Sequence, residues 1–377
     1  MEVSSQPIPL VDLIAQYQGI KSEMDEAIQA VLNGGKYVGG SLVDQFAVAF
    51  AEYCEVPHCV PCGNGTDALE MALASLGIGH GDEVIIPDLT FVATLEAVCN
   101  VGAKPILCDI DPHRYTIDPV QAISLVNDRT KAIIPVHLYG QMADMDPLMS
   151  YAMDHHLFVI EDAAQAHGAS YKGQSAGSIG DINTFSFYPG KNLGAYGDAG
   201  ALTTKSEWLA MKALKLSNHG RISKYNHETV GRCSRMDVLQ AAILGVKLKH
   251  LNEWVHRRRQ IAHRYRTALG GSDQIILPRD YPDSPSAYHL FVIRVDPAIR
   301  DDVRKFLKQA GIETGVHYPK ALSQLPVTTG PLHIHTHCPE SEKASKEVIS
   351  LPIYPELTAG QQDYICEQII MYFNIIH

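Results

Sequence analysis

One lysine, Lys191, lies in a glycine-rich stretch that directly follows an apolar, strand-like run. Residues 184–201 read TFSFYPGKNLGAYGDAGA, and glycines of this density occur where a backbone bends tightly or closely approaches a ligand. Upstream, residues 157–169 (LFVIEDAAQAHGA) predict a buried strand that ends on the carboxylate of Asp162. A pyridoxal phosphate (PLP) enzyme needs a lysine to form a Schiff base and an acid to keep the pyridine nitrogen protonated. The pair therefore predicts PLP chemistry.

A phosphate site is the second feature that such a cofactor requires. Residues 63–73 (GNGTDALEMAL) predict a glycine turn that leads into a helix, with Thr66 near its start. Free N–H groups and the helix dipole make this terminus suitable for phosphate, and the hydroxyl of Ser186 could bind the same group. Taken alone, the motif favours an ordinary capped helix, and the downstream lysine and acid make a phosphate cradle the better interpretation. It matches neither a dinucleotide fingerprint nor a P-loop.

Side chains that could contact the cofactor ring follow two other predicted strands. Residues 87–98 (PDLTFVATLEAV) place Phe91 at the start of a helix, where it could stack on a flat ring or simply belong to the core. Gln165 and His167 follow Asp162 by three and five residues, so either could reach a ring hydroxyl. For His167, a structural role is the alternative.

The elements that must position these groups form a regular alternation. From residue 63 to about residue 204, short apolar runs alternate with helical patterns, which predicts a mostly parallel sheet covered by helices on both faces. The runs are residues 83–87, 104–110, 131–140, 157–162 and 184–187. Ligands of such sheets collect beyond the carboxyl ends of the strands, where Asp162, His137 and Lys191 are expected.

The length of 377 residues predicts a large and a smaller domain. We place the PLP-binding α/β domain, with an N-terminal helical segment, at residues 1–250 and the small C-terminal α+β domain at 251–377. Other predicted elements are helices at 20–32, 43–53, 237–269 and 301–311, strands at 289–295 and 312–319, and a terminal helix.

Composition excludes several classes of protein. A net charge of −11 argues against binding to nucleic acid, and neither a signal peptide nor a membrane span is predicted, so we expect a cytoplasmic protein. The eight cysteines are expected to be mostly buried thiols, and the CVPC pair of Cys59 and Cys62 is a weak indication of a metal or redox site. Residues 333–337 (HIHTH) favour a solvated loop over a metal site, and residues 256–259 (HRRR) an exposed helix face. We predict no bound metal.

Ten motifs, in order along nearly the whole chain, give it a family resemblance. They are GNGTDALEMAL, TFVAT, DIDP, PVHLYGQ, VIEDAAQAHGA, FSFYPGKNLGAYGDAGA, NHGR, SRMDVLQAAIL, GVHYP and LPIYPELT. The set resembles the PLP-dependent nucleotide-sugar aminotransferases of the DegT/StrS family, within the aspartate aminotransferase superfamily. The resemblance implies a fold-type-I PLP-transferase and a homodimer whose active sites use both subunits.

The resemblance also implies roles for individual residues. Lys191 would form the Schiff base and shuttle the proton, while Asp162 would pair with the pyridinium nitrogen. The remaining cofactor contacts would come from Gly65, Thr66, Phe91, Gln165 and Ser186, with Cys233 at a position that reaches the partner subunit's cofactor phosphate. Substrate contacts are expected from Tyr188, Lys224, His317 and Tyr318.

Two positions depart from the family pattern. The family usually has Gly-x-Asn-x-Arg before the QAA helix, whereas this chain has Cys233 in place of the asparagine. A thiol is a weak donor, so we expect looser phosphate binding or compensation by Arg232 or Ser234. After HYP the family commonly has a histidine, and this chain has Ser323. That change bears on recognition of the sugar or nucleotide.

The predicted reaction is transamination of a nucleotide-linked keto-sugar with L-glutamate as the amino donor, yielding an amino sugar and 2-oxoglutarate. The motifs PVHLYGQ and GRxxKYxH favour a 3-keto deoxyhexose or uronic acid. The alternatives are a 4-keto-sugar aminotransferase and a PLP-binding regulatory protein without turnover. A sugar dehydratase of the same family is disfavoured, because those enzymes replace the lysine with histidine.

Overall fold

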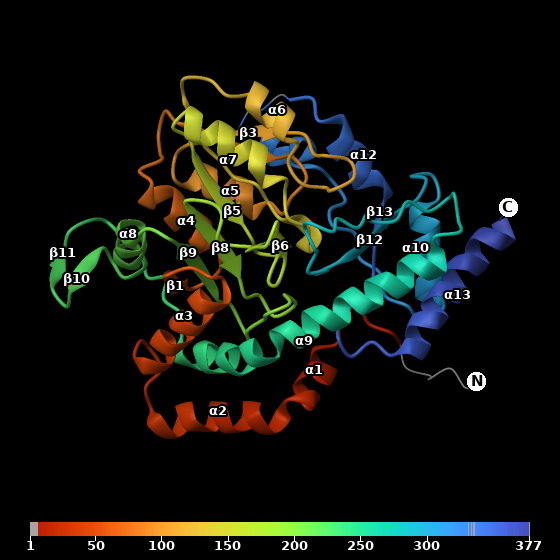
Figure 1. Cartoon of the computed structure of the whole chain (residues 1–377), viewed down its shortest axis with the longest axis horizontal. Helices are drawn as coiled ribbons and strands as arrows, with labels where there is room; N and C mark the ends of the chain where they lie inside the picture. The colour runs from red at the N-terminus through yellow and green to blue at the C-terminus, as the bar shows by residue number, and fades with distance from the viewer. Residues whose placement is uncertain (1–6, 331, 333, 335, 377) are drawn as a thin grey trace.

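The computed structural model describes residues 7–330, 332, 334 and 336–376, and its centre is a seven-stranded sheet in the order β1-β9-β8-β5-β4-β2-β3 (Figure 1). The strands are β1 (His58–Cys62), β2 (Glu83–Pro87), β3 (Lys104–Cys108), β4 (Thr130–Ile133), β5 (Phe158–Asp162), β8 (Ile182–Ser186) and β9 (Gly200–Thr204). From β3 across to β8 all neighbours pair in parallel, whereas β9 runs antiparallel to both β8 and β1. The predicted α/β fold with a mostly parallel sheet is confirmed.

Both faces of the sheet are buried, which explains why its strands are continuous apolar runs. Ile85 of β2 packs on the face covered by α3 (Ser41–Tyr53), α6 (Pro119–Ser124), α7 (Met145–Asp154) and part of α9 (Val238–Leu269). Its neighbours Val84 and Ile86 pack on the opposite face, against α4 (Gly65–Ser75), α5 (Ala93–Asn100) and α8 (Glu207–Ser217).

The long helix α9 joins two parts of the molecule. Its first half packs against α3 and α2 (Lys21–Gly34), and its second half against α13 (Ala359–Ile376), as Figure 1 shows. A separate hydrophobic cluster unites that second half with α10 (Arg300–Gln309), α13 and the two-stranded sheet of β12 (Phe291–Arg294) and β13 (Val348–Leu351). The predicted boundary at residue 250 falls inside α9, and the division into two domains stays a prediction.

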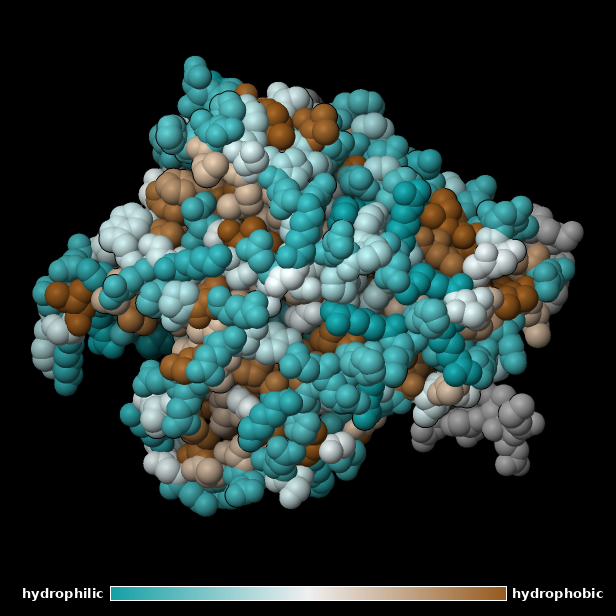
Figure 2. All heavy atoms as spheres, viewed as in Figure 1, coloured by the Kyte–Doolittle hydropathy of each residue, from teal (hydrophilic) through white to brown (hydrophobic). Residues whose placement is uncertain are grey.

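Shorter elements complete the described chain. They are α1 (Leu13–Gly19), η1 (Leu138–Gly140), β6 (Ser170–Tyr171), β7 (Gln174–Ser175), β10 (Arg221–Ser223), β11 (Asn226–His227), η2 (Leu322–Gln324), α11 (Pro326–Thr329) and α12 (Pro339–Glu347). The β10–β11 hairpin stands away from the sheet at the left of Figure 1. Figure 2 shows polar side chains over most of this face, with hydrophobic side chains at the surface of the hairpin.

Several predicted strands differ from the observed ones. The strand predicted at 131–140 ends at Ile133, since Pro135 has no N–H to donate and the chain turns into η1. The strand predicted at 312–319 is wrong, because that segment forms only isolated bridges at Ile312 and Gly315. Strands β1 and β9 were not among the predicted runs. In the described residues, no helix is long and apolar enough to cross a bilayer.

Candidate active site

A cavity of about 630 Å³ lies beyond the carboxyl ends of β5 and β8. Its walls include most of the residues that the sequence singled out: Gly65, Thr66, Phe91, Asp162, Gln165, Ser186, Tyr188, Lys191, His317 and Tyr318. These residues come from widely separated segments of the chain, from the start of α4 to the segment after α10. The fold thus gathers into one cavity the predicted lysine, acid and phosphate-binding groups.

Lys191 lies in the loop between β8 and β9, and the protein holds this loop firmly. The N–H of Lys191 donates to the carbonyl of Tyr188 at 2.8 Å, and Asn192 Nδ2 donates to the carbonyl of Ala287 at 2.9 Å. From α9, Lys247 Nζ donates to the carbonyl of Gly194 at 2.7 Å. Burial lowers the pKa of Lys191 to about 8, although the Asp162 carboxylate acts in the opposite direction. A neutral amine is therefore accessible near pH 8.

Asp162 is the last residue of β5, and its carboxylate is buried. Oδ2 accepts a hydrogen bond from the hydroxyl of Thr94 at 3.0 Å, and Oδ1 accepts one from the N–H of Ala164 at 3.2 Å. Burial raises the pKa of Asp162, while these two bonds and the charge of Lys191 oppose the rise. A cationic ring nitrogen would stabilise the ionised carboxylate further.

The start of α4 and the end of β8 form a narrow cradle in the cavity wall. A Cβ atom on Gly65 would lie 2.7 Å from Cβ of Ser186, so only glycine allows these two segments to come so close. The side chain of Asn64 already caps the N–H of Asp67 at 2.8 Å. Gly65 and Thr66 at the start of α4 and Ser186 all line the cavity, so a helix N-terminus and a hydroxyl residue lie side by side, which fits a phosphate group.

Gln165 links the cavity floor to the segment that contains His317 and Tyr318. Its Oε1 accepts from the N–H of Tyr139 at 2.7 Å, and its Nε2 donates to the hydroxyl of Tyr318 at 3.2 Å. The ring of Tyr318 lies 5.8 Å from that of Phe91, which is 55% exposed at the cavity wall. The exposed face of Phe91 is available to pack against a planar ring.

A family model described as the DegT/DnrJ/EryC1/StrS aminotransferase family matches residues 18–370. The chain belongs to this family. The predicted fold type and the predicted enzyme class, a sugar aminotransferase, are thereby confirmed.

The chain is similar to several relatives over nearly the whole of their length. The pleiotropic regulatory protein of Geobacillus stearothermophilus is 42% identical over 97% of this chain and 99% of its own. The dTDP-3-amino-3,4,6-trideoxy-alpha-D-glucose transaminase of Streptomyces venezuelae is 43% identical over 94% of this chain and 93% of its own. The UDP-2-acetamido-2-deoxy-3-oxo-D-glucuronate aminotransferase of Pseudomonas aeruginosa is 40% identical over 95% of this chain and 98% of its own.

Solved structures of the family have the same fold. The S. venezuelae DesV structure, in complex with a ketimine intermediate, superimposes with a TM-score of 0.95 at 41% identity and covers 98% of this chain and 99% of that one. The Bacillus subtilis NtdA structure, with bound cofactor PMP, gives a TM-score of 0.92 at 34% identity, with coverage of 99% and 86%.

Two predicted family contacts, Lys224 and Cys233, are not among the described residues that line the cavity of this chain. Lys224 lies in the turn of the β10–β11 hairpin, and Cys233 is exposed after it. Neighbours of Cys233 are already engaged within the chain, because Arg232 is bonded to Glu70 and the hydroxyl of Ser234 donates to Asp67 at 2.6 Å. Both partners lie on α4, near the phosphate cradle. Compensation for the missing asparagine stays a prediction.

The sequence analysis missed some residues of the cavity wall. Arg258, predicted to be exposed, is buried, and its Nη1 donates to the carbonyls of Tyr288, His289 and Ile353. Arg258, His289 and Ile353 all line the cavity. No local signal could have revealed this, since α9 changes its neighbours halfway along its length.

Three other predicted features lie elsewhere. His167 packs between Phe185 and Phe187 and does not face the described cavity wall, consistent with a structural role. Cys59 and Cys62 belong to clusters on opposite faces of the sheet, so they cannot act as a pair. His333 and His335 lie outside the described residues. Within the described part of the chain, no group of three or more histidine, cysteine or acidic side chains is arranged to hold a metal.

Proposed function

We propose that this protein uses PLP to transfer the amino group of L-glutamate to carbon 3 of a nucleotide-linked keto-sugar. The observation that carries the proposal is the presence of Lys191 and Asp162 in one cavity, next to a cradle that fits phosphate. Membership of an aminotransferase family supports the same chemistry.

The choice of acceptor is supported by the names of two relatives. Both act on nucleotide-linked sugars, and in both names the amino or oxo group is at carbon 3. These names favour a 3-keto sugar over the 4-keto alternative. One is a deoxyhexose and the other a uronic acid, so either class of acceptor is consistent with the proposal.

Bound PLP would supply an electron sink beside the carbon that loses its proton. The N–H groups at Gly65 and Thr66 and the hydroxyl of Ser186 would hold its phosphate, and Phe91 would pack against its ring. The amide of Gln165 is held in one orientation by Tyr139 and Tyr318. It would contact the ring hydroxyl.

Lys191 and Asp162 would divide the acid–base work. Burial lowers the pKa of Lys191 to about 8, so its Nζ can act as a neutral amine. It would take up the α-proton of the amino donor and return it to the adjacent carbon of the cofactor. Asp162 would keep the ring nitrogen protonated, since an ion pair there compensates for the cost of a buried carboxylate. The cavity walls would exclude water while the proton moves.

A homodimer would complete the site. Apolar side chains on one stripe of α8 are exposed, namely Trp208, Met211 and Leu214, and Tyr225 and Val230 are 84% and 91% exposed on and after the hairpin. Surfaces of this kind commonly mark protein interfaces. We infer that a second copy of the chain packs against these apolar side chains and against the β10–β11 hairpin. This arrangement would bring Lys224 and Cys233 to the partner's cavity.

A regulatory protein without turnover is the second candidate. It is favoured by one relative, whose name is pleiotropic regulatory protein. The presence of Lys191 and Asp162 in one cavity argues for turnover instead, because these are the two groups that proton transfer on the cofactor requires.

The first test is the visible absorption spectrum of the purified, PLP-loaded protein before and after addition of L-glutamate. We expect the band of the lysine-bound cofactor to disappear with L-glutamate and to persist with D-glutamate. The Lys191→Ala variant is the control and should lack the normal band. A wild-type band that L-glutamate leaves unchanged would exclude this donor and favour the regulatory role.

The acceptor is tested by adding dTDP- and UDP-linked 3-keto and 4-keto sugars to the glutamate-treated protein. Return of the cofactor band, with the new amine located at carbon 3 by NMR, is the expected result. Amination only at carbon 4 would contradict the proposed regiochemistry while leaving the aminotransferase class intact.

The shared site is tested by subunit mixing. Lys191→Ala homodimers should be inactive and Lys224→Ala homodimers weakly active, whereas mixed dimers should regain activity because one of their two sites combines both wild-type residues. No gain on mixing, with exchange of subunits verified by mass spectrometry, would contradict a shared site.

A further inference from the structure

Two buried aspartates directly follow neighbouring strands on the cavity side of the sheet. Asp88 comes after β2 and Asp109 after β3, and the last residues of these strands, Pro87 and Cys108, are paired in parallel. Both side chains are almost inaccessible to solvent. Since an isolated buried carboxylate is unfavourable, each must have hydrogen-bond donors nearby.

Asp88 finds its donors in the segment after His317 and Tyr318. Its Oδ1 accepts from the N–H of Ser323 at 2.6 Å, and its Oδ2 accepts from the hydroxyl of Ser323 at 2.7 Å. The backbone carbonyl of Asp88 accepts from the N–H of Leu322 at 2.8 Å. Three bonds therefore fix residues 322–323 to the end of β2. Ser323 is the position at which the sequence departs from the family resemblance.

Asp109 makes an equivalent set of contacts farther along the chain. Its Oδ1 accepts from the N–H and the hydroxyl of Ser341, both at 2.7 Å, and its Oδ2 accepts from the N–H of Glu340 at 2.8 Å. These donors belong to the first turn of α12. The two aspartates thus anchor two successive segments in the same manner.

Among the described residues, neither anchor lines the cavity, but the Asp88 anchor adjoins two side chains that do. Phe91, three residues after Asp88, and Tyr318, five residues before Ser323, both line the cavity and bring their rings to 5.8 Å. In the described part of the chain, no cavity-lining residue lies within five positions of Asp109 or Ser341. The Asp88–Ser323 pair is therefore the point at which the backbones behind these two aromatic side chains are fixed to each other.

We propose that Asp88 and Ser323 are positioning residues that set the distance between Phe91 and Tyr318 and thereby the fit of the sugar acceptor. This inference rests on the proposed function for its readout in catalysis. It gives Ser323 a role, because its hydroxyl and its N–H both satisfy the neighbouring carboxylate at short range. Ser323 lies in the segment of Tyr318, an expected substrate contact, whereas the carbonyl of Phe91 is bonded to the N–H of Thr94 in α5. Loss of the anchor should therefore displace Tyr318 and leave the cofactor contact of Phe91 in place.

The surroundings of Asp88 add a dependence on pH. Burial raises the pKa of Asp88 to about 6; both donors of Ser323 oppose the rise, and the charges of Asp109 and Glu342 add to it. Cys338 faces the same carboxylate. A protonated Asp88 accepts the two Ser323 donors less well, so binding of the acceptor should weaken as the pH falls through about 6.

The experiment measures the two half-reactions separately in Ser323→Ala and Asp88→Asn, with Ser341→Ala as the matched control. We expect the first two variants to raise KM for the sugar acceptor about 10-fold and to leave the spectral response to L-glutamate within about twofold. Ser341→Ala should change neither the KM for the sugar acceptor nor the spectral response to L-glutamate. The rise of KM between pH 7 and 5.5 should be present in the wild type and absent in Asp88→Asn.

Hydrogen–deuterium exchange gives a readout that needs no activity. Ser323→Ala should speed exchange in a peptide spanning residues 315–325, and Ser341→Ala should not. An unchanged KM, unchanged exchange in this peptide, or an equal loss in both half-reactions of Ser323→Ala would overturn the inference. If the wild type itself does not respond to L-glutamate, the proposed function fails, and the exchange data alone decide whether the pair fixes this wall.

Discussion

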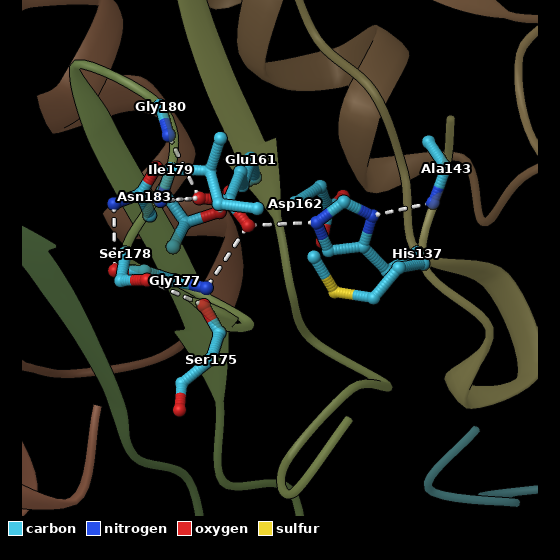
Figure 3. A network of polar contacts seen from close by, with 12 residues as sticks. His137, Ala143, Glu161, Asp162, Ser175, Gly177, Ser178, Ile179, Gly180 and Asn183 are labelled. Carbon is cyan, nitrogen blue, oxygen red and sulfur yellow. Dashed lines mark hydrogen bonds and ion pairs between the residues drawn. The ribbon is translucent and has the colours of Figure 1, made fainter. Parts of the chain in front are cut away.

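Two consecutive carboxylates on β5, Glu161 and Asp162, face opposite sides of the sheet and have opposite surroundings. Glu161 accepts from the N–H groups of Gly177, Ile179 and Gly180 at 2.6–2.9 Å, and from Nε2 of His137 at 2.8 Å (Figure 3). Nδ1 of His137 accepts a hydrogen bond from the N–H of Ala143. Nε2 therefore carries the ring hydrogen and donates the hydrogen bond to Glu161. Among the described residues, the Asp162 carboxylate accepts from two donors, Thr94 and Ala164.

The difference separates a carboxylate that stabilises the fold from one that is available to a ligand. Burial alone would raise the pKa of Glu161, but His137 and the backbone N–H groups bring it below its ordinary value. The pKa of Asp162 remains raised, because burial outweighs its two donors. Asp162 therefore retains unused acceptor capacity on the side of the cavity, and Glu161 does not. Unsatisfied acceptor capacity, more than burial, distinguishes the functional acid.

The largest effect is expected from Asp162→Asn. Without a negative charge, the site cannot hold a pyridinium nitrogen protonated, and we expect the rate of the glutamate half-reaction to fall by about 1,000-fold. Stopped-flow absorbance of the PLP-loaded variant measures this rate. Thermal stability should be unchanged or higher, since a buried charge is removed. A variant that keeps a rate within about 10-fold of the wild type would show that Asp162 does not act on the cofactor.

Glu161→Gln is the complementary change, and its effect should appear in stability. The amide nitrogen of glutamine cannot accept from the donors that face one oxygen of Glu161, and a buried unsatisfied donor costs about 1–3 kcal/mol, so the free energy of unfolding measured in urea should fall by at least that amount. The rate per folded molecule should stay within about threefold, since the side chain points away from the cavity. A stable but inactive variant would contradict this division of roles.

The two acids also predict opposite dependences of stability on pH. Because the folded state lowers the pKa of Glu161, its contribution is present above the unfolded value of 4.5 and is lost as the pH falls through the folded value. The raised pKa of Asp162 makes stability decrease as the pH rises from 3.8 through its folded value. Unfolding temperatures measured between pH 3 and 7 test both statements. On acidification, the unfolding temperature of Glu161→Gln should fall less than that of the wild type. The unfolding temperature of Asp162→Asn should exceed that of the wild type by a margin that grows with pH.

The sequence predicted Asp162 and Lys191, because both follow apolar runs that end at the same edge of a parallel sheet. It also predicted the limits of β2 and of α9 to within about one residue, since these are long or strongly apolar segments. The partners of Glu161 could not be predicted, because His137 and Gly177–Gly180 reach it only through tertiary packing. The same holds for Asp88 and Ser323, which are 235 residues apart. Arg258 was misplaced since helical periodicity identifies a face but not what will cover it.

A second comparison concerns two lysines, Lys191 and Lys247, whose pKa values are both lowered to about 8 by burial. Lys247 lies outside the described cavity wall, with Nζ bonded to the carbonyl of Gly194 and 4.2 Å from the ring centroid of Tyr196. A lowered pKa therefore does not by itself identify the catalytic lysine.

Lys247→Met should give the smallest effect. Loss of the bond to Gly194 is partly offset by removal of a buried charge, so we expect the free energy of unfolding to change by no more than about 1 kcal/mol. The glutamate half-reaction should slow by about threefold, through a less rigid loop around Lys191. Urea unfolding and stopped-flow absorbance measure the two quantities, with Lys191→Met as the control that abolishes the reaction. If Lys247→Met were as inactive as that control, the amine of Lys247 would have to act in proton transfer, and geometry would no longer distinguish the two lysines.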